Sequence, residues 1–320
     1  MTEIPNLDNA AETGRIARFL VETVSLRLKR RGLVLGVSGG VDSAVSAALA
    51  AMAVGRERVF ALLMPERECS DGGLERARRL CRGLGIRHEI EDITPALEAV
   101  GCYHRRDEAI RAVFPDYGTG WRHKVAIAGM MRPGAIPHFV LVVESPDGHR
   151  RSARMPAEVY TRVVAATNFK QRIRKALEYY HAERLSYAVL GTPNRLEYEL
   201  GFFVRGGDGL ADIKPIAHLY KTQVYALAAH LGIPEDIRSQ PPTTDTYSLP
   251  QTQEEFYFGL PTALADRLLH AYSADIPPPL VARQMGMTEE QVEQVYRDFA
   301  GKKRVAARSL RDAYVLDAAP

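Results

Sequence analysis

Apolar positions along the first third of the chain follow two alternating patterns. They recur at helical spacing from Ile16 to Leu28, and residues 33–37 then form a short apolar run typical of a buried strand. The same alternation continues with predicted helices over 44–53 and 74–84 and predicted strands over 59–64 and 87–93. Strands that alternate with helices predict a parallel sheet with right-handed crossovers.

This pattern is interrupted between Gly101 and Ala157. Inside that block, an apolar run from Phe139 to Val143 precedes a Pro-Asp-Gly turn, which predicts a β-hairpin. The pattern then resumes, with helices predicted over 159–184, 220–231, 256–272 and 279–299 and a strand over 186–191. We therefore expect one α/β domain over 1–320, with a doubly wound, mainly parallel sheet, an insertion over 101–157 and a helical C-terminal part over 245–320.

Composition narrows the class of protein. The net charge of +3 is nearly balanced, which disfavours a dedicated nucleic-acid binder. Cys69, Cys81 and Cys102 are isolated and odd in number, which favours a reducing compartment over a disulfide framework. The N-terminal segment is polar, and no run of about 20 apolar residues occurs. We expect a cytoplasmic protein without a membrane span.

The stretch LGVSGGVDSAVSAALA, residues 35–50, carries the clearest chemistry. Its glycines let a ligand approach the backbone, and the N-terminus of the following helix attracts an anion. The hydroxyls of Ser38 and Ser43 suit phosphate oxygens, whereas Asp42 would repel phosphate unless Mg²⁺ lay between them. The lysine of a Walker A loop is absent. An ordinary glycine-rich turn is the alternative interpretation.

The six residues SGGVDS resemble the PP-loop of ATP pyrophosphatases, which cleave ATP between its α- and β-phosphates. Downstream segments resemble NAD synthases in particular, in the order Gly191-Thr192, Glu197, Phe202-Phe203, Gly207-Asp208-Gly209, Asp212-Ile213, Pro215 and Leu219-Tyr220-Lys221. The helix with Asn168, Arg172 and Arg174 resembles that family as well. The resemblance extends over roughly two thirds of the chain, and its strength lies in the joint order of the motifs.

The resemblance implies a Rossmann-like PP-loop fold and a ligase that uses ATP and Mg²⁺. It adenylates the carboxylate of nicotinic acid adenine dinucleotide, and ammonia then displaces AMP. Catalytic residues implied are Asp42, Lys221 and Thr243, and metal ligands are Asp42 and Glu197. Implied ATP-binding residues are Gly36, Ser38, Gly39, Gly40, Asp42, Ser43, Met64, Thr192, Lys221, Thr243, Lys302 and Lys303. Implied substrate-binding residues are Arg172, Arg205, Asp208 and Asp212.

Each of several residues also has a plainer interpretation. Glu197 could form a surface salt bridge, and Lys221 could be a solvated lysine at a helix start. Thr243 and Asp208 could serve only their turns. Met64 could be core filling.

Three departures from the family pattern concern the insertion, the C-terminus and a mobile loop. The 101–157 block is long, Lys302-Lys303 stands where the family has His-Lys, and Gln253 replaces an aspartate. An amide ligase for a different carboxylate is therefore the first alternative. A tRNA sulfur-transfer enzyme and a non-catalytic nucleotide-binding protein are further alternatives.

Partners follow from the same resemblance. Only one helix is predicted before the glycine turn, so we expect no fused glutaminase; free ammonia, or ammonia from a separate glutaminase, is the nitrogen source. The resemblance also implies a homodimer through the helix that follows the insertion.

Overall fold

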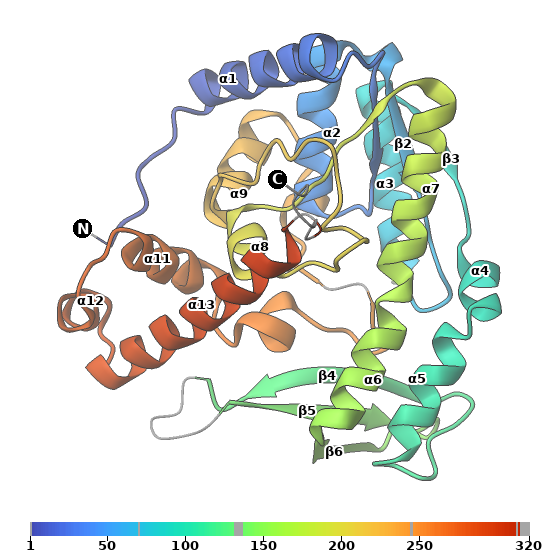
Figure 1. The fold of residues 1–320 in the computed structure, drawn as a ribbon, viewed down its shortest axis with the longest axis vertical. Coiled ribbons are helices and arrows are strands. Elements are labelled where there is room, and N and C mark those ends of the chain that lie inside the picture. Colours follow the sequence, from blue (N-terminus) through green and yellow to red (C-terminus); the bar gives the residue numbers. More distant parts are fainter. Residues whose placement is uncertain (1, 70, 131–136, 244–245, 312, 314–320) are drawn as a thin grey trace, which may run out of the picture.

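A four-stranded parallel sheet forms the centre of the molecule (Figure 1). The computed structural model describes residues 2–69, 71–130, 137–243, 246–311 and 313. The sheet has the order β3-β2-β1-β7, with β1 (Leu33–Gly36), β2 (Val59–Leu63), β3 (Arg87–Ile90) and β7 (Ala188–Val189). All three strand pairs are parallel, which confirms the predicted sheet.

Side chains alternate between the two faces of the sheet. Leu33 and Leu35 of β1 point to one face and Val34 to the other, and all three are fully buried. The first face packs on α1 (Asn9–Glu22), α2 (Val41–Val54), α3 (Asp71–Leu84) and α9 (Lys221–His230). The second face packs on α4 (Thr94–Ala99), α5 (Cys102–Arg111) and α7 (Phe169–Leu185). Helices on both faces make the sheet doubly wound.

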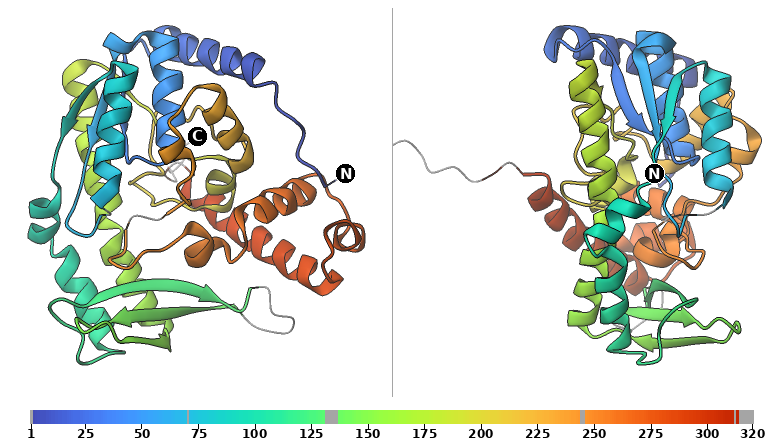
Figure 2. Two further views of the ribbon diagram at one scale, coloured as in Figure 1. Left: turned by 180° about the vertical axis from the view of Figure 1, so that it is seen from behind. Right: turned by 90° about the vertical axis from the view of Figure 1, so that its right-hand side faces the viewer.

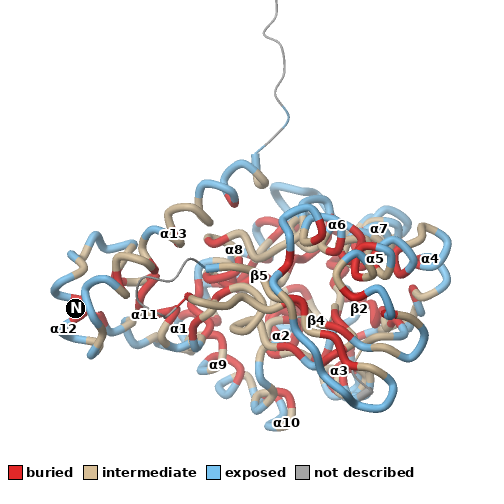
Figure 3. Tube along the Cα trace, turned by 90° about the horizontal axis from the view of Figure 1, so that it is seen from below, coloured by how far each residue is buried: buried red, intermediate tan, exposed pale blue. Residues whose placement is uncertain are grey.

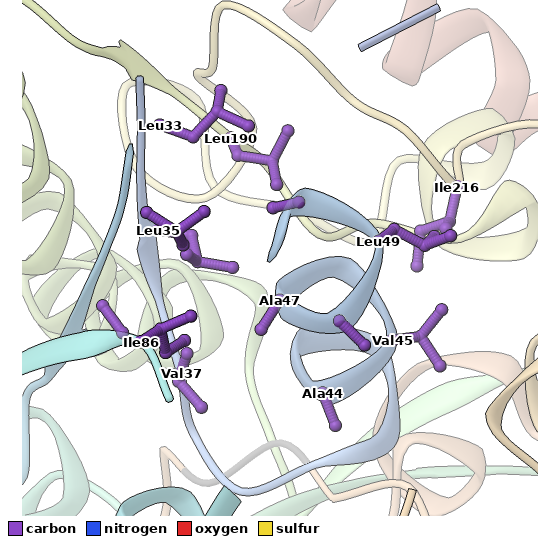
Figure 4. Close-up of a cluster of buried hydrophobic side chains, with 14 of the residues drawn as sticks. Leu33, Leu35, Val37, Ala44, Val45, Ala47, Leu49, Ile86, Leu190 and Ile216 are labelled. Atoms are coloured by element: carbon purple, nitrogen blue, oxygen red, sulfur yellow. The ribbon is translucent and has the colours of Figure 1, made fainter. Parts of the chain in front are cut away.

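The packing between β1 and α2 follows from small residues on the helix. Figure 4 shows Ala44 and Ala47 of α2 among the larger side chains of Leu33, Leu35 and Val37. Four alanines of α2 are fully buried: Ala44, Ala47 and Ala50 with no exposure and Ala48 with 6%. Small side chains let the helix axis approach the sheet closely, and this fixes the direction of the helix N-terminus.

The strand order creates a switch point between β1 and β7. The chain leaves β1 toward α2 on one face, whereas α7 leads into β7 from the other face. In open α/β sheets, ligands bind at the carboxyl ends of strands where the connections diverge in this way. The predicted glycine turn, residues 38–43, lies at this position.

The inserted block forms a second layer of structure rather than a simple hairpin. Strands β4 (Arg122–Ala128), β5 (His138–Glu144) and β6 (Arg150–Arg154) make an antiparallel sheet in that order. The predicted hairpin is β5–β6, joined through a turn in which the Ser145 backbone N–H donates to the His149 carbonyl at 3.0 Å. Figure 2 shows this sheet at one end of the molecule, beneath α5 and α6 (Ala157–Thr167).

Three predicted helices are divided in the structure. The 159–184 helix becomes α6 and α7 with Asn168 between them. The 256–272 helix becomes a single π-helical turn, Glu254–Phe258, and α11 (Thr262–Ser273), separated by Gly259 at φ 67° and Pro261. The 279–299 helix becomes α12 (Pro278–Met285) and α13 (Glu289–Ser309), separated by Gly286 at φ 67°. A left-handed glycine ends a helix, so periodicity alone overran the boundaries at Gly259 and Gly286.

Shorter elements complete the described chain. They are the π-helical turn Thr23–Arg27, the 3₁₀ turn Arg56–Arg58, α8 (Arg195–Leu200) and α10 (Glu235–Arg238). The helices α8, α11, α12 and α13 share an apolar cluster of their own. Figure 3 shows the buried positions concentrated in the interior, with exposed positions along α12. None of the helices described is both long and apolar enough to cross a bilayer.

Candidate active site

The glycine turn between β1 and α2 is shaped for a close backbone approach. Gly39 has φ 85°, and a Cβ there would lie 2.4 Å from the Gly73 carbonyl oxygen, so only glycine fits. Gly40 caps α2 without any side-chain hydrogen bond. Ser43 Oγ donates to the Gly40 carbonyl at 3.0 Å and lies 3.3 Å from Ser38 Oγ. The first N–H groups of α2 therefore have no side-chain cap, which is the arrangement that binds an anion.

A large cavity opens at the carboxyl ends of the parallel strands. Its volume is about 810 Å³. Residues that follow three strands line it, namely Ser38–Ser43 after β1, Met64–Arg67 after β2 and Leu190–Pro193 after β7. Aromatic and apolar residues of α6 and of the segments 201–204 and 246–257 line it as well. The cavity can therefore hold a ligand that has both anionic and apolar parts.

Three charged side chains meet in the wall of this cavity. Lys221 Nζ forms an ion pair with Asp42 Oδ2, and Asn194 Nδ2 donates to Asp42 Oδ1 at 3.2 Å. Glu197 is the third residue of α8 and forms a capping box with the N-cap residue Asn194, in which Asn194 N donates to Glu197 Oε2 at 3.0 Å. The contacts of Asp42 with Asn194 and Lys221 bring together residues that are 152 and 179 positions apart in the chain.

The electrostatics of this cluster suit a divalent cation. Burial and the Asp42 carboxylate raise the pKa of Glu197, although Lys221 opposes them. Burial lowers the pKa of Lys221, but Asp42 and Glu197 outweigh it and raise that pKa. Two carboxylates held together at a buried position repel each other, and carboxylate oxygens are ligands that Mg²⁺ prefers. Asp42 and Glu197 therefore fit the metal that the sequence predicted.

The structure rules out two of the plainer interpretations. Lys221 is 2% exposed, so it is not a solvated lysine, and Glu197 is 8% exposed, so it does not form a surface salt bridge. Met64, Thr192 and Thr243 line the cavity, and Met64 also belongs to the apolar cluster beneath the sheet.

Asp208 serves its own turn and still faces the cavity. Asp208 Oδ1 accepts from the Val204 backbone N–H at 2.7 Å, which holds the Gly207–Gly209 turn. It is also one of the cavity-lining residues. The turn-forming contact is therefore present, and it leaves the second carboxylate oxygen available for a ligand.

Three predicted substrate residues lie outside the lining of the cavity in one chain. Arg172 Nε donates to the Arg205 carbonyl at 3.3 Å. Asp212 accepts from the Val189 backbone N–H at 2.7 Å and from the Tyr179 hydroxyl at 3.2 Å. Neither arginine nor Asp212 is among the residues that line the cavity. Within one chain, Asp212 acts as a brace between β7 and α7.

The two C-terminal lysines are likewise outside the lining. Lys302 donates to the Tyr257 carbonyl at 2.8 Å and pairs with Asp298, and Lys303 pairs with Glu199 at 2.7 Å. These contacts attach α13 to the aromatic segment that borders the cavity and to α8. Their ATP-binding role stays a prediction.

A row of charged residues on α7 was given no role in the sequence analysis, which named only Arg174 among them. Lys170, Arg174 and Glu178 recur every four residues, and Arg174, Lys175 and Glu178 line the cavity. Lys175 pairs with Glu178 inside the structure. Charges at i, i+4 and i+8 on a helix that must cover a sheet are the signal that could have identified this face.

A second group of potential metal ligands is already balanced by protein charges. Glu89, Glu91 and His181 each bring one ligand atom within 4.8 Å of the others. Arg184 donates to His181 Nδ1 at 2.9 Å, and Arg87 and Arg184 lie 3.0 and 3.5 Å from the Glu89 carboxylate. With two guanidinium groups in place, this group has no excess negative charge for a cation.

The fold and the cavity define a class of protein. A parallel sheet with an uncapped glycine turn at its switch point, beside two carboxylates and a buried lysine, is the arrangement of an α/β nucleotide-binding enzyme. The chain belongs to the NAD synthase family, whose model matches residues 12–113 and 149–304. The unmatched residues 114–148 contain all of β4 and β5.

Individual relatives agree with this family. The chain is 52% identical to the NH(3)-dependent NAD(+) synthetase of Rhizobium rhizogenes over 97% of this chain and 93% of the relative. It is 38% identical to the NH(3)-dependent NAD(+) synthetase of Thermotoga maritima over 75% of this chain and 79% of the relative. The solved NH3-dependent NAD synthetase from Campylobacter jejuni shares the fold, with a TM-score of 0.63 and 23% identity over 98% of this chain and 100% of that one.

Proposed function

We propose that this chain is an ammonia-dependent NAD synthase. It uses ATP to adenylate the carboxylate of nicotinic acid adenine dinucleotide and transfers ammonia to give NAD, AMP and pyrophosphate. The observation that carries the proposal is the cluster of Asp42, Glu197 and Lys221 beside the glycine turn, in a chain of this family. The names of the relatives favour the dinucleotide over a different carboxylate.

The residues of the chain divide the work on ATP. The turn from Ser38 to Ser43 and the first N–H groups of α2 hold the pyrophosphate end of ATP. Asp42 and Glu197 would hold Mg²⁺, which would supply positive charge against the phosphate oxygens. Lys221, which the two carboxylates keep protonated, neutralises the charge that develops as the α-phosphate is attacked. Met64 and Thr192, at the ends of two strands, line the ATP site.

We propose that the dinucleotide is bound with help from a second copy of the chain. Asp208 faces the cavity, whereas Arg172, Arg205 and Asp212 lie outside its lining in one chain. A homodimer in which the region around α7 meets its counterpart would bring these residues to a shared site. Ammonia enters from solution or from a separate glutaminase, and the enzyme works in the cytoplasm.

Sulfur transfer is disfavoured at two of the three cysteines, Cys81 and Cys102. Burial raises the pKa of Cys81 to about 12 and that of Cys102 to about 11. A sulfur carrier needs a thiolate near neutral pH, and neither side chain supplies one.

Pyrophosphate release with a panel of carboxylic acids tests the proposal. With ATP, Mg²⁺ and ammonium present, kcat/KM for nicotinic acid adenine dinucleotide should exceed that for nicotinate and nicotinate mononucleotide by at least about 100-fold. Glutamine in place of ammonium should give no NAD. A different acid with the highest kcat/KM would replace the proposed substrate, and pyrophosphate release with none of the acids would remove the catalytic proposal.

A further inference from the structure

The segment 242–255, in which residues 244 and 245 lie outside the described structure, has two ends that meet at the cavity; we call it the 242–255 loop. Thr243 and Thr252 form an antiparallel β-bridge, and the Gln253 backbone N–H donates to the Pro242 carbonyl at 2.9 Å. Both Thr243 and Gln253 line the cavity. Because the loop is closed at this neck, Thr243 and Gln253 lie side by side in the wall that faces Glu197.

The outer side of the 242–255 loop rests on the inserted strand β4. The His123 backbone N–H donates to Ser248 Oγ at 2.9 Å, and the Leu249 backbone N–H donates to the His123 carbonyl at 3.0 Å. The Gln251 side-chain amide donates to the Val125 carbonyl. Leu249 is 1% exposed and Gln251 is 5% exposed, so the loop is packed against the strand rather than loosely placed over it.

Two further polar contacts attach the 242–255 loop. Lys124 of β4 pairs with Glu255 at 2.6 Å. Lys170 of α7 donates to the Thr246 carbonyl at 2.8 Å. Residues of the 101–157 block do not themselves line the described cavity, so the insertion acts on the cavity through this loop.

The inner side of the loop reaches the metal-site carboxylate. Gln253 Nε2 donates to Glu197 Oε1 at 2.9 Å, while Asn194 N donates to Oε2. Each oxygen of Glu197 thus accepts a hydrogen bond from a neutral donor, which fixes the plane of the carboxylate. Two oxygens with about four lone-pair sites keep acceptor capacity for a cation. Neutral groups that orient a ligand in this way raise the affinity of a metal site.

We propose that Gln253 is a positioning residue for the divalent-cation site and that strand β4 holds it there. The inserted sheet keeps the 242–255 loop in place, and the loop delivers the Gln253 amide to Glu197. This inference rests on the proposed function, since it assigns Glu197 to the cation. It also gives the insertion a role, because β4 lies within the residues that the family model does not match.

Binding of Mn²⁺ in the presence of α,β-methylene ATP tests this role without turnover. Free Mn²⁺ is measured by electron paramagnetic resonance. Gln253→Ala should lower the affinity for Mn²⁺ by about 10- to 100-fold. In turnover assays kcat should fall by a similar factor, while KM for the dinucleotide stays within about twofold because the Gln253 amide donates to Glu197. Gln284→Ala, an exposed glutamine on α12, is the matched control and should behave as the parent.

The contribution of β4 is tested by the double variant Ser248→Ala, Gln251→Ala. Hydrogen exchange at the Leu249 and Gln253 amides should accelerate, and Mn²⁺ affinity should fall together with it. A Gln253→Ala variant that binds Mn²⁺ within about twofold of the parent would overturn the role of Gln253. Unchanged amide exchange in the double variant would overturn the role of β4. If the parent protein shows no NAD synthesis but Gln253→Ala still lowers its affinity for Mn²⁺, the proposed reaction is wrong and the positioning role of Gln253 is retained.

Discussion

Replacement of Asp42 by asparagine is expected to slow pyrophosphate release by about 10²- to 10³-fold, the loss found when one preorganised electrostatic group is removed from an active site. The amide keeps the shape of the carboxylate and can still accept from Asn194, but it cannot neutralise a cation. In the variant, the carboxylate of Glu197 still provides a negative charge near Lys221, so the chain should remain folded. Steady-state pyrophosphate release and the circular-dichroism melting curve measure the two effects separately.

The control for this variant is Asp236→Asn. Asp236 pairs with Arg79 at the surface, where both side chains are about half exposed. The same change of charge there should alter turnover by less than about twofold, because an exposed pair contributes little. Asp42→Asn with turnover close to that of the parent would contradict the assignment of Asp42 to the metal site.

The largest effect on stability is expected at Lys170. Its side chain has no exposure, and its Nζ donates to Glu66 at 2.9 Å, to Glu68 at 2.7 Å and to the Thr246 carbonyl at 2.8 Å. Lys170→Met leaves two carboxylates without their shared counter-charge. We expect a loss of about 3–5 kcal/mol in the free energy of unfolding, measured by urea denaturation at pH 7.

The difference should shrink in acid. Burial alone raises the pKa of Glu68, but Lys170 and Arg106 outweigh it and lower that pKa to about 2, below the ordinary value of 4.5. A carboxyl group with a depressed folded-state pKa stabilises the protein above pH 4.5 and loses that contribution as the pH falls toward 2. The parent should therefore lose stability over this interval, and Lys170→Met should lose less.

Arg27→Met serves as the control for Lys170→Met. Arg27 pairs with Glu22 at 2.7 Å, and both side chains are more than half exposed, at 62% and 52%. Its loss should cost less than about 1 kcal/mol. A Lys170 variant with an equally small cost would show that the buried pairs do not hold the structure together.

Local signals made the parallel sheet and the glycine turn predictable. Apolar runs of strand length alternate with helical periods in this part of the chain, and Gly39 and Gly40 mark the turn where the backbone must approach a ligand. The residue type at Asp42 indicated a cation beside a phosphate, and the resemblance to the NAD synthase family added Glu197 and Lys221. Their proximity in the structure follows from the strand order, because the carboxyl ends of β1 and β7 are adjacent.

Other features depend on contacts between distant segments and gave no local signal. Strand β4 begins with three consecutive polar residues, Arg122, His123 and Lys124, so it lacks the alternation that would predict a strand, and it is defined by its pairing with β5. Burial of Lys170 depends on carboxylates about 100 positions away. In the sequence, Gln253 was noted only as a replacement for the aspartate of the family pattern. Its amide contact with Glu197 depends on the path of a loop that β4 supports.

In the proposed reaction a substrate carboxylate attacks the α-phosphate of ATP in this cavity. Nicotinic acid adenine dinucleotide labelled with ¹⁸O in both carboxylate oxygens tests this step, through mass spectrometry of the products. We expect one ¹⁸O atom in the phosphate of AMP, one in the amide of NAD and none in pyrophosphate. Unlabelled AMP, or label in orthophosphate with ADP as the other product, would contradict it.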